Sequence, residues 1–345
     1  MSNTINLVTK FQPLLDEVYK AASLTGDLEN GAVKFDGSKT VKVLKLTVPA
    51  LGAYTRNTGY TAGDVTADWE PFTLTQDRGT EFSVDAMDNE ETLNMTFGNA
   101  SSEFIRRSVV PQVDAYRFAK MVQENGITRK QATLTTGDEV IAAINAAMTA
   151  MDEDEVTAEG RILYITPTEY GLIQALESYK SKACMDRFAK VIQVPGTRFY
   201  TNVTVNNSGY SASSAVTESF TGDGSAKVFT LTAPDKPAYI DKITVDGTAN
   251  SKYTYDPATG KITFATAPAS TKAVAVSYNE GLPLNFMIVD PKAVFAVAKH
   301  KKLRIFDPDT NQKRDDYLFQ YRLYHDMFVY PQKAAGVYAH FAAKA

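Results

Sequence analysis

The side chains that most often do chemistry are few in this 345-residue sequence. It holds one cysteine, three histidines and one tryptophan. A single cysteine excludes an internal disulfide and any metal site of the Cys-x-x-Cys type. His325 stands beside Asp326, a pairing that general-base catalysis uses. Adjacent residues of a strand point to opposite faces, and no motif marks a nucleophile, so we interpret His325 as structural.

Two acidic stretches have residue types that bind metal ions. Asp307, Asp309 and Asn311 match the opening of a calcium loop, but its glycine and its final glutamate are missing. The acidic run 152–155 is more typical of a solvated helix end. Cys184 lacks a nucleophile signature, and no phosphate-binding glycine motif occurs. We therefore expect no catalytic residue, metal or cofactor, and a protein that is not an enzyme.

The overall composition favours surface contact over catalysis. Tyrosine and phenylalanine number 18 each. Lysine and arginine total 36 against 40 acidic residues, so the net charge is −4 and no global basic field exists to hold nucleic acid. No stretch approaches the roughly 18 apolar residues that span a bilayer, and the first residues do not resemble a secretion signal. The sequence predicts a cytoplasmic, soluble protein without a membrane partner.

An amphipathic helix is expected near the start of the chain. Apolar residues recur there at spacings of three and four, which is the helical period. A helix this short needs cover for its apolar stripe, either from its own domain or from a partner. Both alternatives stay open, and Phe11 and Leu15 are candidate partner contacts.

Two alternating stretches, 40–48 and 71–84, predict the strands of a hairpin. Residues 49–70 between them are polar, rich in glycine and threonine, and too long for a tight turn. We expect them to form a projecting arm. A two-stranded arm is rarely stable in isolation, so its own domain or a neighbouring subunit must hold it.

A long helix is predicted from Asp88 to about Met121. Asp88 and Glu91 resemble a capping box at its start, and Gly126 follows its end. Pro111 lies inside this helix, where proline removes a hydrogen bond and clashes with the preceding turn. We expect a kink or a break there.

Helices and short strands interleave in the next part of the chain and return after residue 282, which indicates an α+β or α/β unit. Helices are expected at residues 138–151, 167–179 and 291–300, and strands at 162–165, 192–194, 199–205 and 286–289.

Residues 207–281, named the insert below, differ in character from both flanks. Helix signals vanish, and glycine-containing turns separate short β-rich runs at a spacing typical of a small β-sandwich. An all-β module that interrupts an α/β unit is most simply an inserted domain. Its strands are expected at residues 216–220, 228–231, 240–245, 253–255, 262–264 and 274–278.

Three stretches resemble the major capsid proteins of tailed bacteriophages with the Hong Kong 97-type shell fold. They are LTQDRGTEFSVDAMDNEET (74–92), EFIRRSVVPQVDAYRFAKM (103–121) and NFMIVDPKAVFAVAKHKKLRIFDPDTNQKRDDYLFQYRLYHDMFVYPQKAAGVYAH (285–340). The resemblance implies an α+β fold, and the insert resembles the immunoglobulin-like modules of phage structural proteins. The implied parts are an N-terminal arm (1–35), an extended hairpin loop (36–87), a spine helix and peripheral domain (88–130), a first axial part (131–206), the insert (207–281) and a second axial and peripheral part (282–345).

The resemblance also implies a function. Such a subunit self-assembles through hexamers and pentamers into an icosahedral head, a virion component formed in the host cytoplasm. Its implied partners are further copies of itself, a separate scaffolding protein, a portal, decoration proteins, and double-stranded DNA enclosed without specific binding. Intersubunit contacts are expected from aromatic and arginine anchors and from ion pairs, although pairs within one chain are an open alternative. The candidates are Tyr54, Arg56, Tyr60, Trp69, Arg78, Glu81, Asp85, Arg106 and Arg107, besides Phe11 and Leu15.

Two other functions remain open. A cellular encapsulin-type nanocompartment uses the same shell fold and would hold a protein cargo instead of DNA. A surface protein that binds carbohydrate through the β-sandwich is the other alternative, and it would be a monomer or a small oligomer.

Overall fold

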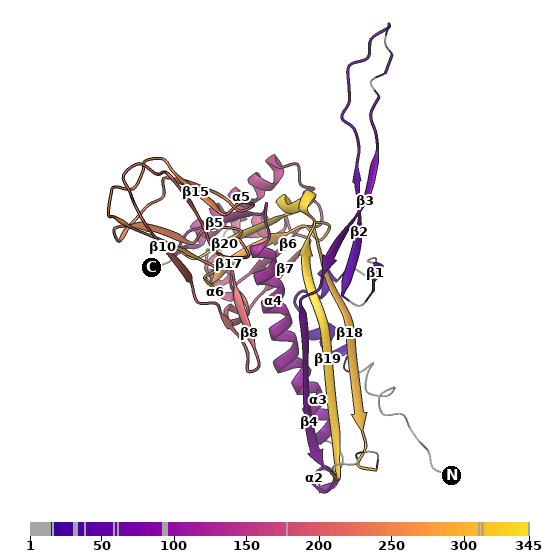
Figure 1. Ribbon diagram of the computed structural model, residues 1–345. Helices are drawn as coiled ribbons and strands as arrows, with labels where there is room; N and C mark the ends of the chain where they lie inside the picture. The colour runs from indigo at the N-terminus through magenta and orange to yellow at the C-terminus, as the bar shows by residue number, and fades with distance from the viewer. Residues whose placement is uncertain are drawn as a thin grey trace. The chain divides into compact units, whose positions relative to one another are not determined.

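A computed structural model describes residues 15, 17–29, 34–37, 39–57, 59, 60, 62–91, 96–176, 179–309, 311 and 314–343, without the side chains of 34, 88–90, 96, 97 and 299–302. The described residues fall into two compact units (Figure 1). Unit 1 takes its residues from Met1–Leu28, Asn89–Phe295 and Met327–Ala345, and unit 2 from Glu29–Asp88 and Ala296–Asp326. The two units are described separately below.

A five-stranded sheet forms the centre of unit 1, in the order β5-β20-β17-β6-β7. Strand β17 is antiparallel to both β20 and β6, whereas β5 and β7 are parallel to their neighbours. Every residue of β6, β17 and β20 is buried, which is why these segments are apolar except for Asn285 and His340. The strands are β5 (Thr128–Gln131), β6 (Ile162–Ile165), β7 (Lys190–Gln193), β17 (Leu284–Val289) and β20 (Val337–Phe341).

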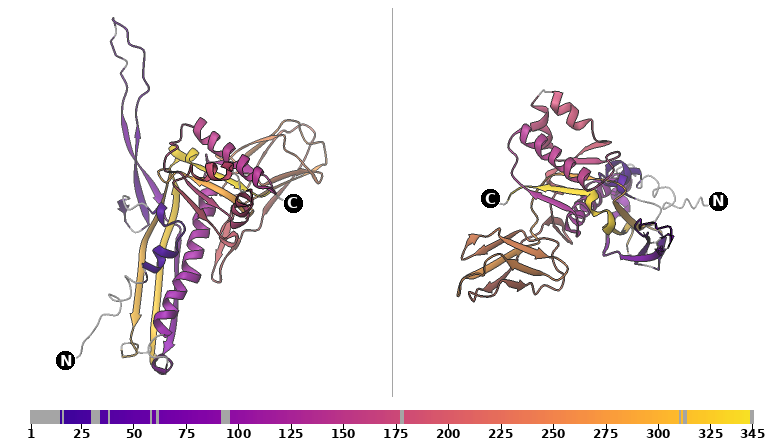
Figure 2. Two further views of the ribbon diagram at one scale, coloured as in Figure 1. Left: turned by 180° about the vertical axis from the view of Figure 1, so that it is seen from behind. Right: turned by 90° about the horizontal axis from the view of Figure 1, so that it is seen from above.

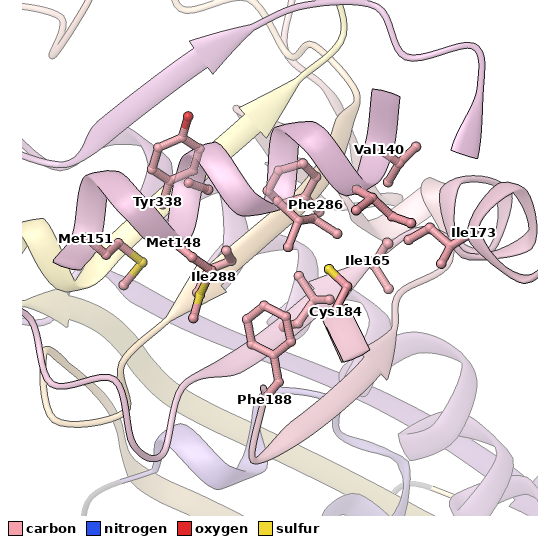
Figure 3. Packing of buried hydrophobic residues seen from close by; sticks show 14 residues of the cluster. Val140, Met148, Met151, Ile165, Ile173, Cys184, Phe188, Phe286, Ile288 and Tyr338 are labelled. Atoms are coloured by element: carbon pink, nitrogen blue, oxygen red, sulfur yellow. The ribbon is translucent and has the colours of Figure 1, made fainter. Parts of the chain in front are cut away.

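Helix α5 (Gly137–Glu153) packs on this sheet and forms the main core with it (Figure 3). A capping box starts α5, because Thr136 Oγ1 accepts the Glu139 N–H at 3.3 Å and the Glu139 carboxylate accepts the Thr136 N–H at 3.1 Å. The helix expected over 167–179 is α6, which ends earlier, at Gln174 (Pro167–Gln174). A second helix, α7 (Tyr179–Met185), follows it. Cys184 therefore lies within α7, where it is buried in the core.

The expected long helix is present as three described segments and an irregular turn. Helices α2 (Ala86–Glu91) and α3 (Thr96–Phe104) come first, and residues 92–95 between them lie outside the described part. A π-helical turn, η2 (Ile105–Val109), then leads into α4 (Val110–Gln123). Pro111 is the second residue of α4, and the wider π turn η2 directly precedes α4, where the proline ring would otherwise clash with the preceding turn. The backbone stays helical through Val109 and Val110, so the break expected at Pro111 is absent and a π-helical turn stands in its place.

The start of this helical region was predicted incorrectly. Helix α2 begins at Ala86, so Asp88 lies inside it and is not its cap. Instead, the Asp85 carboxylate accepts the Met87 N–H at 2.9 Å. Asp85 therefore satisfies a free N–H at the helix start, which is the task expected of Asp88.

The described part of the N-terminal segment packs on its own unit. Residues 15 and 17–22 are helical, and Leu15 and Tyr19 are 5% and 2% exposed. The loop after this helix and the short helix η1 (Gly26–Leu28) follow. Leu15 is thus covered within its own chain, while Phe11 lies outside the described residues.

Asp114, fully buried on α4, fixes the loop that follows the N-terminal helix. Its carboxylate accepts hydrogen bonds from Ser23 Oγ at 3.1 Å, and from Thr25 N and Oγ1 at 3.2 and 2.7 Å. Arg117 Nη1 donates to Thr25 Oγ1 at 2.9 Å. Burial raises the pKa of Asp114, while Thr25, Leu24 and Arg117 oppose that rise. We call this cluster the Asp114 clasp.

The insert contains two antiparallel sheets that share one core, as the orange strands in Figure 2 show. The orders are β10-β16-β12-β13 and β11-β15-β14. All six strands expected from the sequence are present. The strands of this region are β8 (Val203–Asn206), β9 (Gly209–Ala212), β10 (Val216–Thr221), β11 (Val228–Thr230), β12 (Lys242–Val245), β13 (Thr248–Ala249), β14 (Tyr253–Asp256), β15 (Lys261–Phe264) and β16 (Ala273–Tyr278).

Unit 2 is built from two three-stranded sheets, β1-β2-β3 and β18-β19-β4. The second alternating stretch of the expected hairpin is split between them: β3 pairs with β2, but β4 pairs with β19. The hairpin is therefore β2 and β3 joined by residues 48–65 (Figure 1). The strands are β1 (Lys34–Asp36), β2 (Thr40–Thr47), β3 (Thr66–Thr73), β4 (Gln76–Asp85), β18 (Val294–Phe306) and β19 (Asp316–Val329), the last two continuing into unit 1.

The helix expected over 291–300 is wrong, because Val294–Phe306 is strand β18. Residues 294–297 are all buried. A strand that is covered on both faces loses its polar–apolar alternation, and consecutive apolar residues then also fit a helical spacing. A short helix, η4 (Pro331–Gly336), connects β19 to β20.

Candidate assembly surfaces

Exposed apolar side chains are concentrated on the hairpin of unit 2 and on the adjoining strand β1. Thirteen large hydrophobic side chains of the described residues are exposed, and nine of them lie between residues 34 and 73. Isolated surface hydrophobics are ordinary, but a group of this kind marks an interaction surface. The nine are Phe35, Leu44, Leu46, Val48, Leu51, Tyr54, Tyr60, Val65 and Trp69.

The hairpin has one apolar and one charged face. In the β2–β3 register, Leu44 lies opposite Trp69, and Leu46 opposite Ala67. Side chains of alternate residues share a face, so these four form one apolar surface, named the hairpin apolar face. Lys45 lies opposite Asp68 on the other face. On the hairpin apolar face, the side chains of Leu44, Leu46 and Trp69 are 45%, 56% and 52% exposed among the described residues.

The loop of the hairpin carries a preformed aromatic pair. Thr55 and Gly59 bridge through two backbone hydrogen bonds of 3.3 and 2.8 Å, and Gly59 has a positive φ of 73°. The rings of Tyr54 and Tyr60 flank this bridge with centroids 5.0 Å apart. Arg56 lies in the turn that the bridge closes. The structure therefore brings together three of the predicted contact residues, and Trp69 lies on the stem of the same hairpin.

The predicted ion-pair residues have partners in their own chain. Arg106 and Arg107 both contact the Glu103 carboxylate, at 2.9 and 2.6 Å. The side chains of these arginines are 57% and 81% exposed, so water screens both pairs. One carboxylate faces two guanidinium groups, which leaves a net positive charge on this stretch of helix.

The predicted contact residues on β4, namely Arg78, Glu81 and Asp85, lie in unit 2, and two of them have hydrogen-bond partners there. Gln320 Nε2 donates to the Glu81 carboxylate at 2.6 Å, Arg78 lies opposite Leu323 in the register, and Asp85 caps α2. A shallow open depression of about 470 Å³ lies on this sheet. Sequence reasoning missed its main ion pair, Arg322 with Asp77, because the pair depends on the β4–β19 register. The depression is lined by Asp77, Gly79, Thr80, Glu81, Gln320, Tyr321 and Arg322.

His325 and Asp326, the adjacent pair considered for catalysis, are buried, and Asp326 holds a loop in place. His325 and Asp326 are 2% and 0% exposed. Asp326 Oδ2 accepts hydrogen bonds from Thr75 N at 2.7 Å and Thr75 Oγ1 at 2.9 Å, which fixes the connection between β3 and β4. Asn311, from the calcium-loop match, bonds to Asp316. Among the described residues, no group of three or more potential metal ligands occurs.

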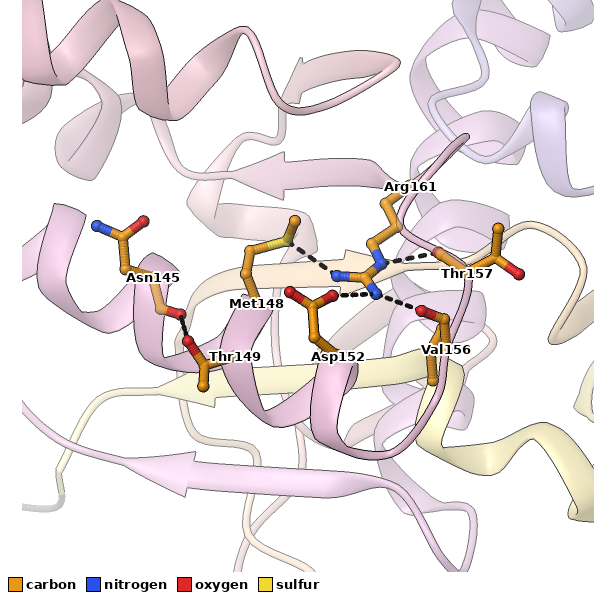
Figure 4. A network of polar contacts seen from close by, with 7 residues as sticks. All are labelled: Asn145, Met148, Thr149, Asp152, Val156, Thr157 and Arg161. Carbon is orange, nitrogen blue, oxygen red and sulfur yellow. Dashed lines mark hydrogen bonds and ion pairs between the residues drawn. The ribbon is translucent and has the colours of Figure 1, made fainter.

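The acidic run at the end of α5 also has a structural partner. Arg161 is fully buried, and its Nη2 bonds to Asp152 Oδ1 at 2.7 Å and to Val156 O at 2.6 Å (Figure 4). Its Nε donates to Thr157 O at 3.0 Å. The guanidinium thus closes the loop after α5, and Asp152 neutralises it.

His340 is held in its neutral form on β20. Its Nδ1 lies 3.1 Å from Asn285 Nδ2, which also donates to Ala132 O at 3.1 Å. Since the amide is a donor, His340 Nδ1 must accept, and a proton there would oppose the amide N–H. Burial, with the charge of Lys130, lowers the pKa of His340 to about 4.

Among the described helices, none has the length and apolar character needed to cross a membrane. No family model matches the sequence, and no curated protein is significantly similar to it. Solved structures do match.

The cyanophage P-SCSP1u capsid matches with a TM-score of 0.51 and 12% identity over 94% of this chain and 89% of that chain. A virus-like particle from Pyrococcus furiosus matches with a TM-score of 0.51 and 10% identity over 97% and 100%. The mature capsid of bacteriophage PhiM1 matches with a TM-score of 0.50 and 10% identity over 90% and 84%. At these identities the similarity establishes the fold: the chain has the mixed α+β, Hong Kong 97-type fold of capsid and virus-like-particle shell proteins.

Proposed function

We propose that this protein is the major capsid protein of a tailed bacteriophage, which self-assembles through hexamers and pentamers into an icosahedral head. The observation that carries the proposal is the half-exposed hairpin apolar face with its aromatic loop, in a chain that has a shell-protein fold. The role is structural and not enzymatic.

Assembly follows from the physical character of the hairpin. Leu44, Leu46 and Trp69 are 45%, 56% and 52% exposed, so covering them with a neighbour removes apolar surface from water. Tyr54, Tyr60 and Arg56 are of the residue types that concentrate interface energy. A hairpin that contacts a different surface on the next copy makes a head-to-tail interface, and such interfaces close into rings.

The proposal assigns the other parts of the chain as follows. Residues 1–35 are the N-terminal arm, 36–87 the hairpin loop, 88–130 the spine and peripheral part, and 131–206 with 282–345 the axial and second peripheral parts. The insert, 207–281, is an immunoglobulin-like β-sandwich that faces outward. Its two antiparallel sheets around one core support this assignment.

The proposed contents are double-stranded DNA, held without specific binding. The net charge of −4 supports this, because a container must let packed DNA move. Further proposed partners are a separate scaffolding protein, a portal and decoration proteins, and the proposed location is the virion.

A second candidate is a shell that encloses protein cargo, as an encapsulin-type nanocompartment does. One observation supports it: the virus-like particle from Pyrococcus furiosus matches with the same TM-score, 0.51, as the cyanophage capsid, and over more of both chains, 97% and 100% against 94% and 89%.

Negative-stain microscopy of the purified full chain tests both candidates, alone and with the products of neighbouring genes. We expect closed shells of uniform size. Nuclease-protected DNA in particles from the native source supports the capsid, whereas a protein cargo without DNA supports the nanocompartment. A monomer in light scattering under all these conditions, together with carbohydrate binding, contradicts both and favours a surface protein.

A further inference from the structure

The insert is attached to the rest of unit 1 through a hydrogen-bonded junction. Thr201, fully buried before the insert, donates from Oγ1 to Glu280 O at 2.8 Å and accepts the Leu282 N–H at 2.9 Å. Gln123, the last residue of α4, donates to Thr201 O at 3.0 Å. The two chain crossings therefore meet beside the C-terminal end of α4.

One side chain of the insert makes a second contact beyond these chain crossings. Tyr239 lies between β11 and β12, and its ring is 6.0 Å from the Phe341 ring, centroid to centroid. The Arg129 guanidinium carbon lies 4.9 Å from the centroid of the same ring. Arg129 is opposite Ala339 in the β5–β20 register, two residues before Phe341, so Arg129 and Phe341 share one face of the sheet.

Arg129 is also the group that satisfies the end of α4. Its Nε donates to Val122 O at 2.8 Å, and its Nη1 to Ile127 O at 3.4 Å. Its Nη2 donates to Glu124 O. The last carbonyls of a helix have no partner inside the helix, and a cation there also favours the helix dipole. Burial lowers the pKa of Arg129 to about 10, so it stays charged at neutral pH.

We propose that the insert is an intramolecular brace. The Tyr239 ring covers Arg129 and holds it against the carbonyls at the end of α4, so the insert stabilises α4 and strand β5 and cannot swivel about its junction. This gives the insert a structural task within its own subunit, whether or not it also binds a partner. The proposal concerns one chain and does not depend on shell assembly.

Hydrogen exchange of the full chain tests the brace. In Tyr239→Ala, amides of residues 122–131 should exchange roughly tenfold faster, which is the loss expected from a partly buried cation–π contact. Strands β12 and β16 in the core of the insert should keep their protection, which shows that the insert is still folded. Tyr239→Phe is the matched control, and because it retains the ring it should behave as the unaltered chain does.

Arg129→Lys provides a second test that leaves the insert unaltered. It removes the planar group that bonds three carbonyls, so residues 122–131 should again exchange faster, and adding Tyr239→Ala should have little further effect. Unchanged exchange at 122–131 in Tyr239→Ala with a folded insert overturns the proposal. If Tyr239→Ala unfolds the insert, the Arg129→Lys variant is the deciding test. Unchanged exchange of residues 122–131 in Arg129→Lys then overturns the proposal.

Discussion

Leu44 on β2 lies directly opposite Trp69 on β3, and both side chains remain about half exposed. A cross-strand pair of this kind contributes only roughly 0.2–1 kcal/mol to its own sheet. The stability of the hairpin alone therefore does not explain two large apolar side chains at these positions. Residues that contact another molecule commonly combine large apolar side chains with exposure.

Replacing Trp69 with alanine should weaken assembly far more than folding. We expect unfolding free energy to fall by no more than about 1 kcal/mol, and the association free energy per contact to weaken by about 2 kcal/mol or more. Light scattering against protein concentration measures assembly, and denaturant unfolding measures stability. Lys45→Ala, on the charged face of the same strand, is the control and should assemble normally. Equal effects of both variants would show that the hairpin apolar face is not the contact.

Breaking the Asp114 clasp should release the loop that follows the N-terminal helix. In Asp114→Ala, Arg198 loses its ion-pair partner, the buried Arg117 loses a nearby negative charge, and Thr25 loses its acceptor, so we expect unfolding free energy to fall by about 3 kcal/mol. Limited proteolysis should then cut near residues 23–25, which the clasp protects in the unaltered chain. The control is Asp27→Asn, whose exposed pair with Lys190 at 2.7 Å is worth about 0–1 kcal/mol. Resistance of Asp114→Ala to proteolysis would count against the clasp.

His340 should make stability fall as the pH falls below neutral. Its pKa is about 4 in the folded protein and near 6.5 when unfolded, so between these values the unfolded state binds more protons. Stability is fully present above pH 6.5 and declines toward pH 4 by at most about 3 kcal/mol. Denaturant unfolding at a series of pH values measures this slope. His340→Gln should be less steep over the same range, and an identical slope would refute the assignment.

Alanine substitution should lower stability much more at the buried Arg161 than at the exposed Arg106. Arg161 is buried with four partners, so Arg161→Ala should cost about 3 kcal/mol, since Asp152 and two carbonyls lose their donor. Arg106→Ala should cost less than about 0.5 kcal/mol because its pair with Glu103 is exposed. Thermal unfolding compares the two. If Arg106→Ala leaves stability intact but blocks assembly, Arg106 is an intersubunit contact as the sequence predicted.

Local patterns in the sequence predicted several elements well. The insert strands are predictable because glycine turns separate them at regular intervals, and α5 because its apolar residues recur at the helical spacing. The capping box that starts α5 is known only from the structure. Tyr54, Arg56 and Tyr60 could be grouped because the loop that brings them together is local.

Long-range pairing explains the errors. Val294 to Val297 are covered on both faces and do not alternate, so the sequence of strand β18 also fits a helical spacing. The partner of strand β4 is β19, more than 200 residues away in sequence, so the local pattern instead predicts that β4 belongs to the hairpin. The Asp114 clasp and the Arg322–Asp77 pair depend on such distant contacts, and no spacing within a short stretch reveals them.

Pro71 lies in β3, which is at the edge of the β1-β2-β3 sheet. Proline cannot donate to a ladder and is found on edge strands, so it interrupts the row of backbone groups that a free edge would offer to another strand. The hairpin can therefore bind another molecule through its side chains, while the proline disfavours edge-to-edge pairing of β3 with a strand of another chain. An unassembled chain with this edge is therefore less prone to edge-to-edge fibrous aggregation than one whose outer strand lacked the proline.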